Sequence, residues 1–174
     1  MNLEFIFNGG ESKRYHTVDT IKTQDIAAHS FGVAWLCEIL TEGYATKSLI
    51  MCALAHDLAE HIVGDLPSPS KRAMSNLAAE AFNAYEEDVL TYGLSNKYSS
   101  KIVLSKDEQR TLRLADMFDG MLFCLRERQL GNTKIGTVYV RFKDYVLEQE
   151  PLTSTETRVF HEINHQWRSI NERR

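Results

Sequence analysis

Apolar residues recur at three- and four-residue spacing along most of the chain, which is the spacing of a helix face rather than the alternation of a strand. The pattern predicts a first helix over 24–42, with Ile26, Val33 and Leu36 on its apolar stripe, and a second over 46–62 that is apolar nearly all round. Further helices are expected over 75–92, 106–130, 134–149 and 153–170. The predicted fold class is therefore all-α, a bundle of about six helices.

Glycines and prolines mark the expected ends of these helices. Gly43 suits the end of the first helix, and Gly131 with Asn132 suits the end of the fourth. The segment GDLPSPSK (64–71) holds two of the three prolines and is predicted to be a loop. The apolar run at 3–7 is compatible with a short strand, which we leave out of the predicted fold. Helix caps are expected at Thr46, Ser75 and either Thr153 or Ser154.

The composition is that of one ordinary globular domain, which we expect to span residues 1–174. The net charge of -4 disfavours binding to a nucleic acid polymer. No stretch approaches the roughly 20 apolar residues of a membrane span, and the first residues lack the features of a signal peptide. Cys37, Cys52 and Cys124 lie in apolar helical stretches without metal-ligand spacing, as buried thiols do. We therefore expect a cytoplasmic protein that does not bind a membrane.

His56 and Asp57 are adjacent polar residues in the apolar second helix. Burying a carboxylate without a partner costs several kcal/mol. Neighbouring helical residues point about 100° apart, yet both can reach one ion at the helix surface. Taken alone, such a pair is more often a hydrogen-bonded histidine beside a capping or ion-paired aspartate.

His29 and Asp116 are equally unexpected, because each lies among apolar residues of another predicted helix. Either one alone is readily explained as a core residue with a polar partner. Two imidazoles and two carboxylates from three helices, however, suit a borderline divalent ion such as Zn, Mn, Fe or Co. One shared metal site explains His29, His56, Asp57 and Asp116 together, whereas the structural alternative needs a separate reason for each.

Two more carboxylates follow this pair. Glu60 lies four residues after His56 and so shares its helix face, and Asp65 lies in the turn that comes next. A carboxylate beside a metal can orient water or protonate a leaving oxygen. The alternatives are a solvated helix residue for Glu60 and an ordinary turn residue for Asp65. His61 is expected to point to another face and is left out of the site.

Cations and an aromatic residue near these segments are candidates for binding a phosphorylated ligand. Arg14 precedes the first helix, and Lys71 with Arg72 follows the proline segment. Tyr15 can stack on a base or sugar or pack in the core, and His16 can contact phosphate or cap a turn. Lone cations are usually solvated surface residues, so only their position in the chain favours these assignments.

The motifs RYHT (14–17), AAHS (27–30), AHDLAE (55–60), GDLPSPSK (64–71) and LADMFDG (114–120) occur in the order found in the HD-domain deoxynucleotide phosphohydrolases. The chain resembles that family over about residues 12–130. Two subgroups are closest: the bacterial 5'-deoxynucleotidases, and the short phage dATP triphosphohydrolases of genomes that replace adenine by 2-aminoadenine. The resemblance implies an HD-domain helical bundle and a small deoxynucleotide as substrate.

The resemblance also implies a role for each matching position. It assigns Glu60 and Asp65 to the hydrolytic step, and Arg14 and Lys71 to phosphate. A Zn, Co or Mn ion would be bound by His29, His56, Asp57 and Asp116. Contacts to the nucleoside would be made by Tyr15, Thr20 and Ile21.

Two features favour one subgroup over the other. The 5'-deoxynucleotidases typically have Arg-Trp after an apolar run, whereas this chain has Arg-Tyr-His-Thr and is shorter. Both features favour the phage enzyme, which converts dATP to deoxyadenosine and triphosphate in the host cytoplasm, with Mg²⁺ on the phosphates. We also expect a homo-oligomer. The alternatives are a 5'-deoxynucleotidase and a non-catalytic nucleotide sensor, and the presence of the non-ligand Glu60 argues against the sensor.

Overall fold

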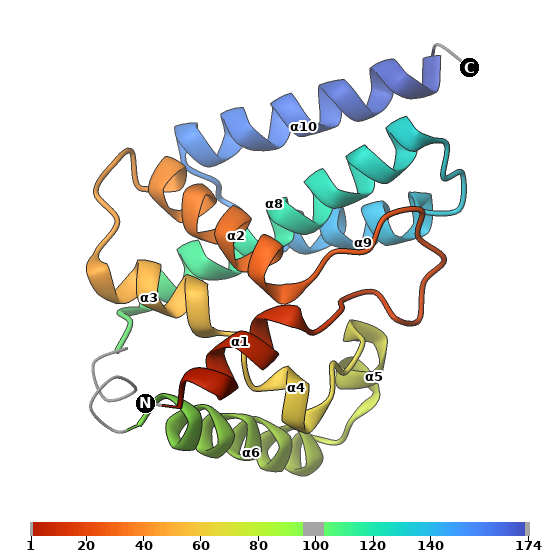
Figure 1. Cartoon of the computed structure of the whole chain (residues 1–174). Coiled ribbons are helices and arrows are strands. Elements are labelled where there is room, and N and C mark those ends of the chain that lie inside the picture. The colour runs from red at the N-terminus through yellow and green to blue at the C-terminus, as the bar shows by residue number, and fades with distance from the viewer. Residues whose placement is uncertain (1, 96–102, 173–174) are drawn as a thin grey trace.

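The computed structural model describes residues 2–95 and 103–172, and these ranges contain helices but no β-strand (Figure 1). The predicted all-α class is confirmed. The helices are α1 (Leu3–Glu11), α2 (Ile26–Leu40), α3 (Lys47–Ala55), α4 (Glu60–Val63), α5 (Ser68–Ala73), α6 (Asn76–Leu94), α8 (Lys106–Leu130), α9 (Gly136–Leu147) and α10 (Ser154–Glu172). No helix among the described residues is long and apolar enough to cross a membrane.

The apolar run at 3–7 begins helix α1 and is not a strand. The Asn2 side chain caps this helix by accepting a hydrogen bond from the backbone N–H of Phe5. The Phe5 ring is buried against α6, where a Cβ added at Gly93 would overlap it. A five-residue apolar run fits a strand or a buried helix turn equally well, so only the tertiary contact distinguishes them.

The predicted second helix, over 46–62, is wrong in its final third. Helix α3 ends at Ala55, residues 56–59 form a turn, and the short α4 follows. The predicted loop at 64–71 is also shorter than expected, because α5 starts at Ser68. Prolines are tolerated in the first turn of a helix, where no intrahelical partner awaits their missing N–H.

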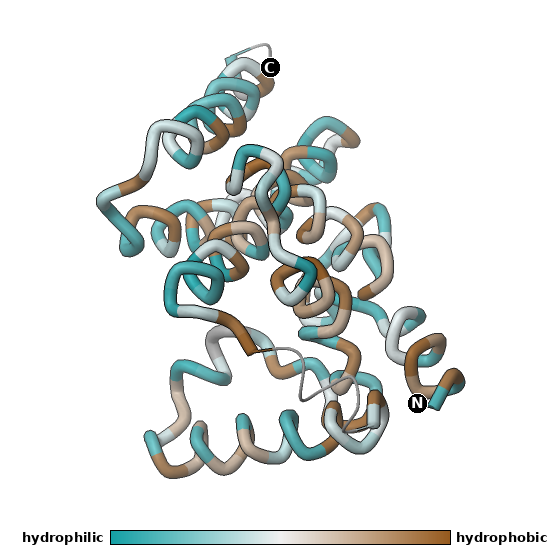
Figure 2. Tube along the Cα trace, turned by 90° about the vertical axis from the view of Figure 1, so that its left-hand side faces the viewer, coloured by the Kyte–Doolittle hydropathy of each residue, from teal (hydrophilic) through white to brown (hydrophobic). Residues whose placement is uncertain are grey.

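Helix α8 is the centre of the fold and packs against α2, α9 and α10 (Figure 1). Its predicted start and end are confirmed: Ser105 and Glu108 form a capping box, and Gly131 ends the helix in the left-handed conformation. The main core around α8 includes Val33, Leu49, Phe118, Tyr139 and Ile163. A second cluster lies between α1, α6 and the end of α3. Hydrophilic residues interrupt the hydrophobic ones along the outer helices α6 and α10 (Figure 2).

Candidate active site

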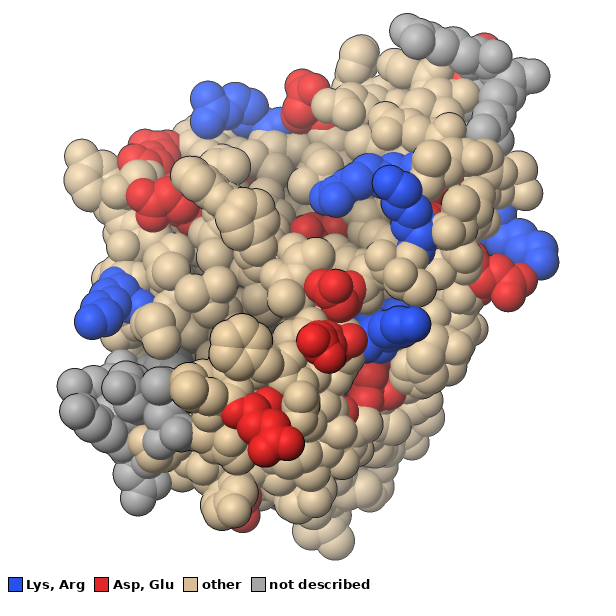
Figure 3. Space-filling view, in the orientation of Figure 1, with Lys and Arg blue, Asp and Glu red and all other residues tan. Residues whose placement is uncertain are grey.

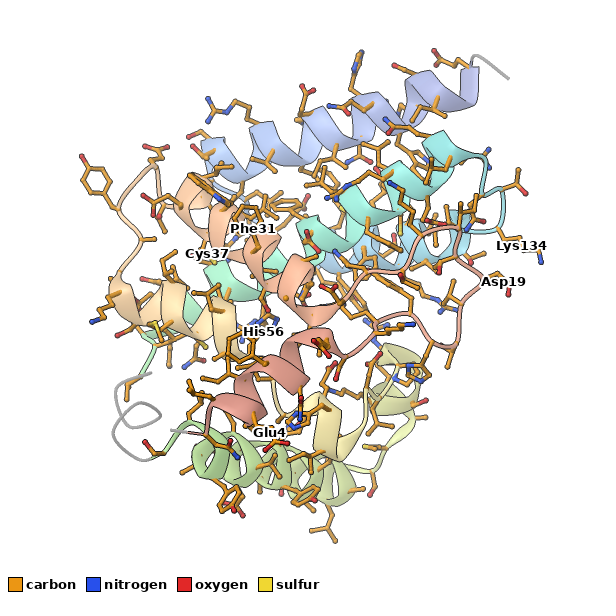
Figure 4. The ribbon with its side chains drawn as sticks, viewed as in Figure 1. Glu4, Asp19, Phe31, Cys37, His56 and Lys134 are labelled. Atoms are coloured by element: carbon orange, nitrogen blue, oxygen red, sulfur yellow. The ribbon has the colours of Figure 1, made fainter. Side chains whose placement is uncertain are left out.

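The four predicted metal ligands converge between α2, the end of α3 and α8. His29 lies one turn into α2, and Asp116 lies in the middle of α8. Because α3 ends at Ala55, His56 and Asp57 lie in the turn that joins α3 to α4. Figure 4 places His56 near the centre of the molecule, between α1 and α2 in this view.

The donor atoms of these residues lie close together. His29 Nε2 is 3.3 Å from His56 Nε2, 3.3 Å from Asp116 Oδ1 and 3.5 Å from Asp57 Oδ2. His56 Nε2 is 3.3 Å from Asp57 Oδ1. His29, His56 and Asp57 each offer one ligand atom within 4.8 Å of the others.

Hydrogen bonds on the far side of both rings fix what the rings present to this centre. His29 Nδ1 lies 2.7 Å from Asp119 Oδ2, and His56 Nδ1 lies 2.9 Å from the carbonyl oxygen of Ala53. Both partners are oxygen acceptors, so each Nδ1 carries a hydrogen and each Nε2 faces the centre as the nitrogen that would ligate a metal. Asp116 Oδ1 is buried, and no hydrogen bond within the described residues reaches it. Facing nitrogens and carboxylate oxygens of this kind fit a divalent cation.

The electrostatics of the cluster agree with this assignment. Burial lowers the pKa of His29, but the close carboxylates of Asp116 and Asp119 outweigh burial and raise the pKa to about 9. The cluster therefore favours a positive charge at the point where the ligand atoms meet.

Asp119 is a residue of this site that the sequence analysis missed. It is buried and accepts hydrogen bonds from His29 Nδ1 and, at 2.8 Å, from Gln24 Nε2. A Cβ at Gly32 would overlap its carboxylate, so α2 can approach α8 closely only with glycine there. The signal was present in the sequence, because Asp119 follows Asp116 by three residues and so shares its helix face.

Arg14 is placed against the carboxylates of the cluster. Its Nη1 is 2.8 Å from Asp57 Oδ2, and its Nη2 is 3.6 Å from Asp116 Oδ1. Tyr15, the next residue, has a positive φ of 60° and stacks on Phe123 with ring centroids 4.3 Å apart. The backbone turn at Tyr15 thus directs the aromatic ring into the core and leaves the guanidinium at the cluster.

Residues 12–25, which carry Arg14, are held at their outer part by the far end of α8. The buried carboxylate of Glu127 accepts hydrogen bonds from the backbone N–H groups of Ile21 and Lys22, both at 2.7 Å, and from Asn132 Nδ2 at 2.8 Å. An exposed ion pair between Asp19 and Lys134 lies at the same edge of the molecule, away from His56 (Figure 4).

A cavity of about 360 Å³ opens beside the cluster. It brings together the predicted residues Arg14, Tyr15, Asp57, Glu60, Asp65, Lys71 and Asp116. Asp65 also pairs with His16 at 3.2 Å, whereas Thr20 and Ile21 are not among the described residues that line the cavity. Their contact with a nucleoside stays a prediction.

Glu60 and Lys71 face this cavity in different electrostatic states. Burial raises the pKa of Glu60, the charges of Asp57 and Asp65 add to this effect, and the resulting pKa is about 8. Lys71 Nζ lies 3.3 Å from Glu86 Oε1 on α6. The cavity therefore offers a carboxyl that can hold a proton near neutral pH and a cation that already has a carboxylate partner.

A sequence model of the 5'-deoxynucleotidase YfbR-like family matches residues 11–165, which include every part of this site. The chain belongs to the YfbR-like 5'-deoxynucleotidase family. One curated relative, 5'-deoxynucleotidase YfbR of Salmonella paratyphi B, is 26% identical over 148 residues, or 75% of this chain and 74% of the relative.

Solved structures share the fold of this YfbR-like protein. An HD-domain phosphohydrolase from Listeria innocua matches with a TM-score of 0.71 and 16% identity, over 98% of this chain and 97% of that one. The cyanophage S-2L HD phosphohydrolase DatZ, solved with dA and one catalytic Zn²⁺ ion, matches with a TM-score of 0.67 and 18% identity, over 99% and 98%. The predicted HD-domain fold is confirmed.

Membership of the YfbR-like family confirms the predicted enzyme class, a phosphohydrolase of deoxynucleotides. The donor set of His29, His56 and Asp57 could hold an ion and is consistent with the predicted divalent metal at the HD site. The family model extends to residue 165, so the resemblance reaches past the segment 12–130 on which it was first based. The extension includes α9, whose contribution to the cavity the sequence analysis did not anticipate.

Replacing Asp119 by asparagine tests whether this carboxylate orients His29. Asparagine has nearly the same shape but loses the negative charge that supports the ring, so metal affinity is expected to fall about 10- to 100-fold. Competition titration against a chelator of known affinity measures this change. Asp107→Asn, at an exposed position on the same helix, serves as the matched control. Unchanged affinity in Asp119→Asn would mean that Asp119 only fills space behind the ring.

Proposed function

We propose that this YfbR-like protein is a metal-dependent 5'-deoxynucleotidase that hydrolyses deoxynucleoside monophosphates to deoxynucleosides and inorganic phosphate. One observation carries the proposal. The two carboxylates of the metal-binding cluster, two further carboxylates and the cations Arg14 and Lys71 all line one cavity. Phosphate ester hydrolysis needs these three kinds of group together.

His29, His56, Asp57 and Asp116 would hold the metal. When bound, a divalent ion lowers the pKa of water and polarises a phosphoryl oxygen. Zn, Co and Mn all suit two imidazoles with two carboxylates. Arg14, which already contacts Asp57 and Asp116, is placed to neutralise the phosphate that lies at this centre.

Glu60 and Asp65 are proposed to manage the protons of the reaction. Water attacks phosphorus, the bond from phosphorus to the 5' oxygen breaks, and the leaving oxygen must gain a proton. A carboxyl with a pKa of about 8, as Glu60 has, can supply one near neutral pH. Asp65 lies beside it on the cavity wall and is paired with His16, which orients its carboxylate.

Contacts to the rest of the substrate are proposed for residues 15–21 and for Lys71. Lys71 lines the cavity from α5 and would contact phosphate oxygen. Tyr15 lines the cavity with its ring backed by Phe123, which leaves it suited to limit the space for the sugar. Roles for Thr20 and Ile21 rest on the resemblance described above, and the role of His16 rests on its place beside Arg14 and Tyr15 in the sequence.

A second candidate function is a dATP triphosphohydrolase that releases deoxyadenosine and triphosphate, with Mg²⁺ on the phosphates. It is favoured by one specific observation. Cations reach the cavity from several elements, namely Arg14 before α2, Lys71 on α5 and Arg141 on α9. A longer anion would use more of these cations than a monophosphate does.

A panel of deoxynucleoside mono-, di- and triphosphates, with products separated by chromatography, tests the proposal. We expect deoxynucleoside and inorganic phosphate from the monophosphates, and loss of all activity after chelation that a divalent ion restores. Binding of nucleotide without any product would instead support the sensing module. The assay is best run on protein whose oligomeric state has been measured, because assembly into a homo-oligomer in the cytoplasm remains an expectation.

An exposed apolar face supports that expectation of self-association. Phe31, Trp35 and Ile39 lie at four-residue spacing on the outer side of α2, and each is more than 40% exposed. The surface over α2 carries few charged side chains in the space-filling view (Figure 3). Apolar stripes of this kind often lie at interfaces between subunits.

A further inference from the structure

Residues 12–25, which we call the Arg14 loop, connect α1 to α2 without forming a helix or a strand. The two ends of the loop are joined, because the backbone N–H of Arg14 donates to the carbonyl oxygen of Gln24 at 2.9 Å. The buried backbone groups between these ends need partners from elsewhere in the fold. Those partners determine where the loop, and with it Arg14, can lie.

Helix α8 contacts the Arg14 loop with three side chains at four-residue spacing. Asp119 accepts a hydrogen bond from the Gln24 side chain at 2.8 Å, and Phe123 stacks on the Tyr15 ring. Glu127, a further turn along, accepts two hydrogen bonds from the loop backbone. The loop thus runs from the metal centre to the connection between α8 and α9 (Figure 1).

Glu127 makes the outermost of these contacts and accepts hydrogen bonds on both carboxylate oxygens. Oε2 accepts from the backbone N–H of Ile21 at 2.7 Å and from Asn132 Nδ2 at 2.8 Å, and Oε1 accepts from the backbone N–H of Lys22 at 2.7 Å. Asn132 Nδ2 also donates to the carbonyl oxygen of Asp19 at 2.8 Å. Glu127 is only 1% exposed, so water cannot readily replace its carboxylate.

The backbone of Tyr15 links this contact to Arg14. Tyr15 has a φ of 60°, a left-handed conformation that a residue with a side chain keeps only where its surroundings hold it. Phe123 holds the ring, and Glu127 holds the chain that follows. Without Glu127, Tyr15 can return to a negative φ, and the turn that directs the guanidinium to Asp57 is lost.

We propose that Glu127 is a positioning residue for Arg14 and fixes its guanidinium against the phosphate from the far end of α8. The proposal rests on the proposed function for the identity of that phosphate. Glu127 is not among the described residues that line the cavity, so its effect on hydrolysis passes through the Arg14 loop. A variant of Glu127 should therefore impair the reaction only as far as Arg14 contributes to it.

Glu127→Gln keeps the shape of the side chain but turns an amide N–H₂ toward a backbone N–H. We expect kcat/KM for dAMP to fall about 10- to 100-fold, with the same division between kcat and KM as in Arg14→Ala, because both variants take the guanidinium from its place. Bound metal should stay at the wild-type level. Lys134→Ala is the matched control, since it removes an exposed ion pair with Asp19 and should change kcat/KM less than about twofold.

A double-mutant cycle distinguishes positioning of Arg14 from a general loss of stability. In an Arg14→Ala background, Glu127→Gln should lower kcat/KM less than about twofold further, because the group that it positions is already absent. Additive losses would overturn the proposal, as would loss of metal or wild-type kcat/KM in Glu127→Gln. Asn132→Ala removes the hydrogen bonds to Glu127 and Asp19, and it replaces Glu127→Gln in the same cycle if that variant does not fold.

Binding of inorganic phosphate separates this proposal from the proposed function. In a calorimeter, metal-loaded Glu127→Gln should bind phosphate about 10-fold more weakly than metal-loaded wild-type protein, whether or not either hydrolyses dAMP. Arg14→Ala should bind it equally with and without Glu127→Gln. Equal affinities of wild-type protein and Glu127→Gln would overturn the role of Glu127. Failure of wild-type protein to hydrolyse any deoxynucleotide would overturn the proposed function instead.

Discussion

Asp57→Ala is expected to lose bound metal and hydrolytic activity together. Asp57 places its carboxylate oxygens 3.3 Å from His56 Nε2 and 3.5 Å from His29 Nε2, so it belongs to the cluster and not to its surroundings. Removing one of the protein ligands of a metal site weakens binding severely. Elemental analysis of the purified variant should therefore find almost no metal, whereas wild-type protein is expected to contain it.

Thermal unfolding adds an independent readout to the same variant. A ligand that binds only the folded state raises the melting temperature, so added Zn²⁺ should stabilise wild-type protein and leave Asp57→Ala unchanged. The fold itself is expected to survive, because Arg14 keeps its second partner, Asp116. Asp19→Ala is the control, since Asp19 is an exposed aspartate whose carboxylate pairs with Lys134. Full metal content in purified Asp57→Ala would refute the ligand assignment.

Glu60→Gln is expected to keep the metal and bind nucleotide almost normally, yet turn over roughly 10²-fold more slowly or worse. The amide preserves the shape of the side chain but carries no titratable proton. Burial and the charges of Asp57 and Asp65 raise the pKa of Glu60 to about 8, so in wild-type protein its proton can be exchanged near the working pH. The limb of the pH–rate profile that reports this group should disappear in the variant.

Glu80→Gln makes the same chemical change at an exposed position on α6 and should leave kcat unaltered. Turnover of Glu60→Gln close to that of wild-type protein would restrict Glu60 to a structural role. A loss of metal would instead place Glu60 among the ligands.

The metal cluster could be predicted from the sequence because its members are chemically out of place. Imidazoles and carboxylates in three apolar segments need a common partner, and His29, His56, Asp57 and Asp116 do meet. The helix boundaries around these residues were harder to predict from the sequence. A run such as 46–62 is apolar on every face, so periodicity gives no sign that it breaks after Ala55.

Residues that act through tertiary contacts gave a weaker signal. Glu127 reads as an ordinary acidic residue near the end of a helix, yet it is buried and holds the backbone of residues 21 and 22. Arg141 lies on a helix whose sequence contains no recognisable motif, and only the approach of α9 to Gly120 brings it to the cavity. Periodicity identifies helices but does not say which of them will be neighbours.

Helix α8 carries Asp116, Asp119 and Glu127 on one continuous run of 25 residues. Each residue of an α-helix adds about 100° of rotation and 1.5 Å of rise. Deleting a single residue between Asp119 and Glu127 would therefore turn the Glu127 carboxylate away from the backbone N–H groups of Ile21 and Lys22, while Asp116 kept its place. Insertions and deletions among related sequences are therefore expected to be absent between Asp119 and Glu127 and to occur after Gly131. A change of length after Gly131 leaves Glu127 in register with Asp116, so the segment that carries Arg14 stays beside the metal centre.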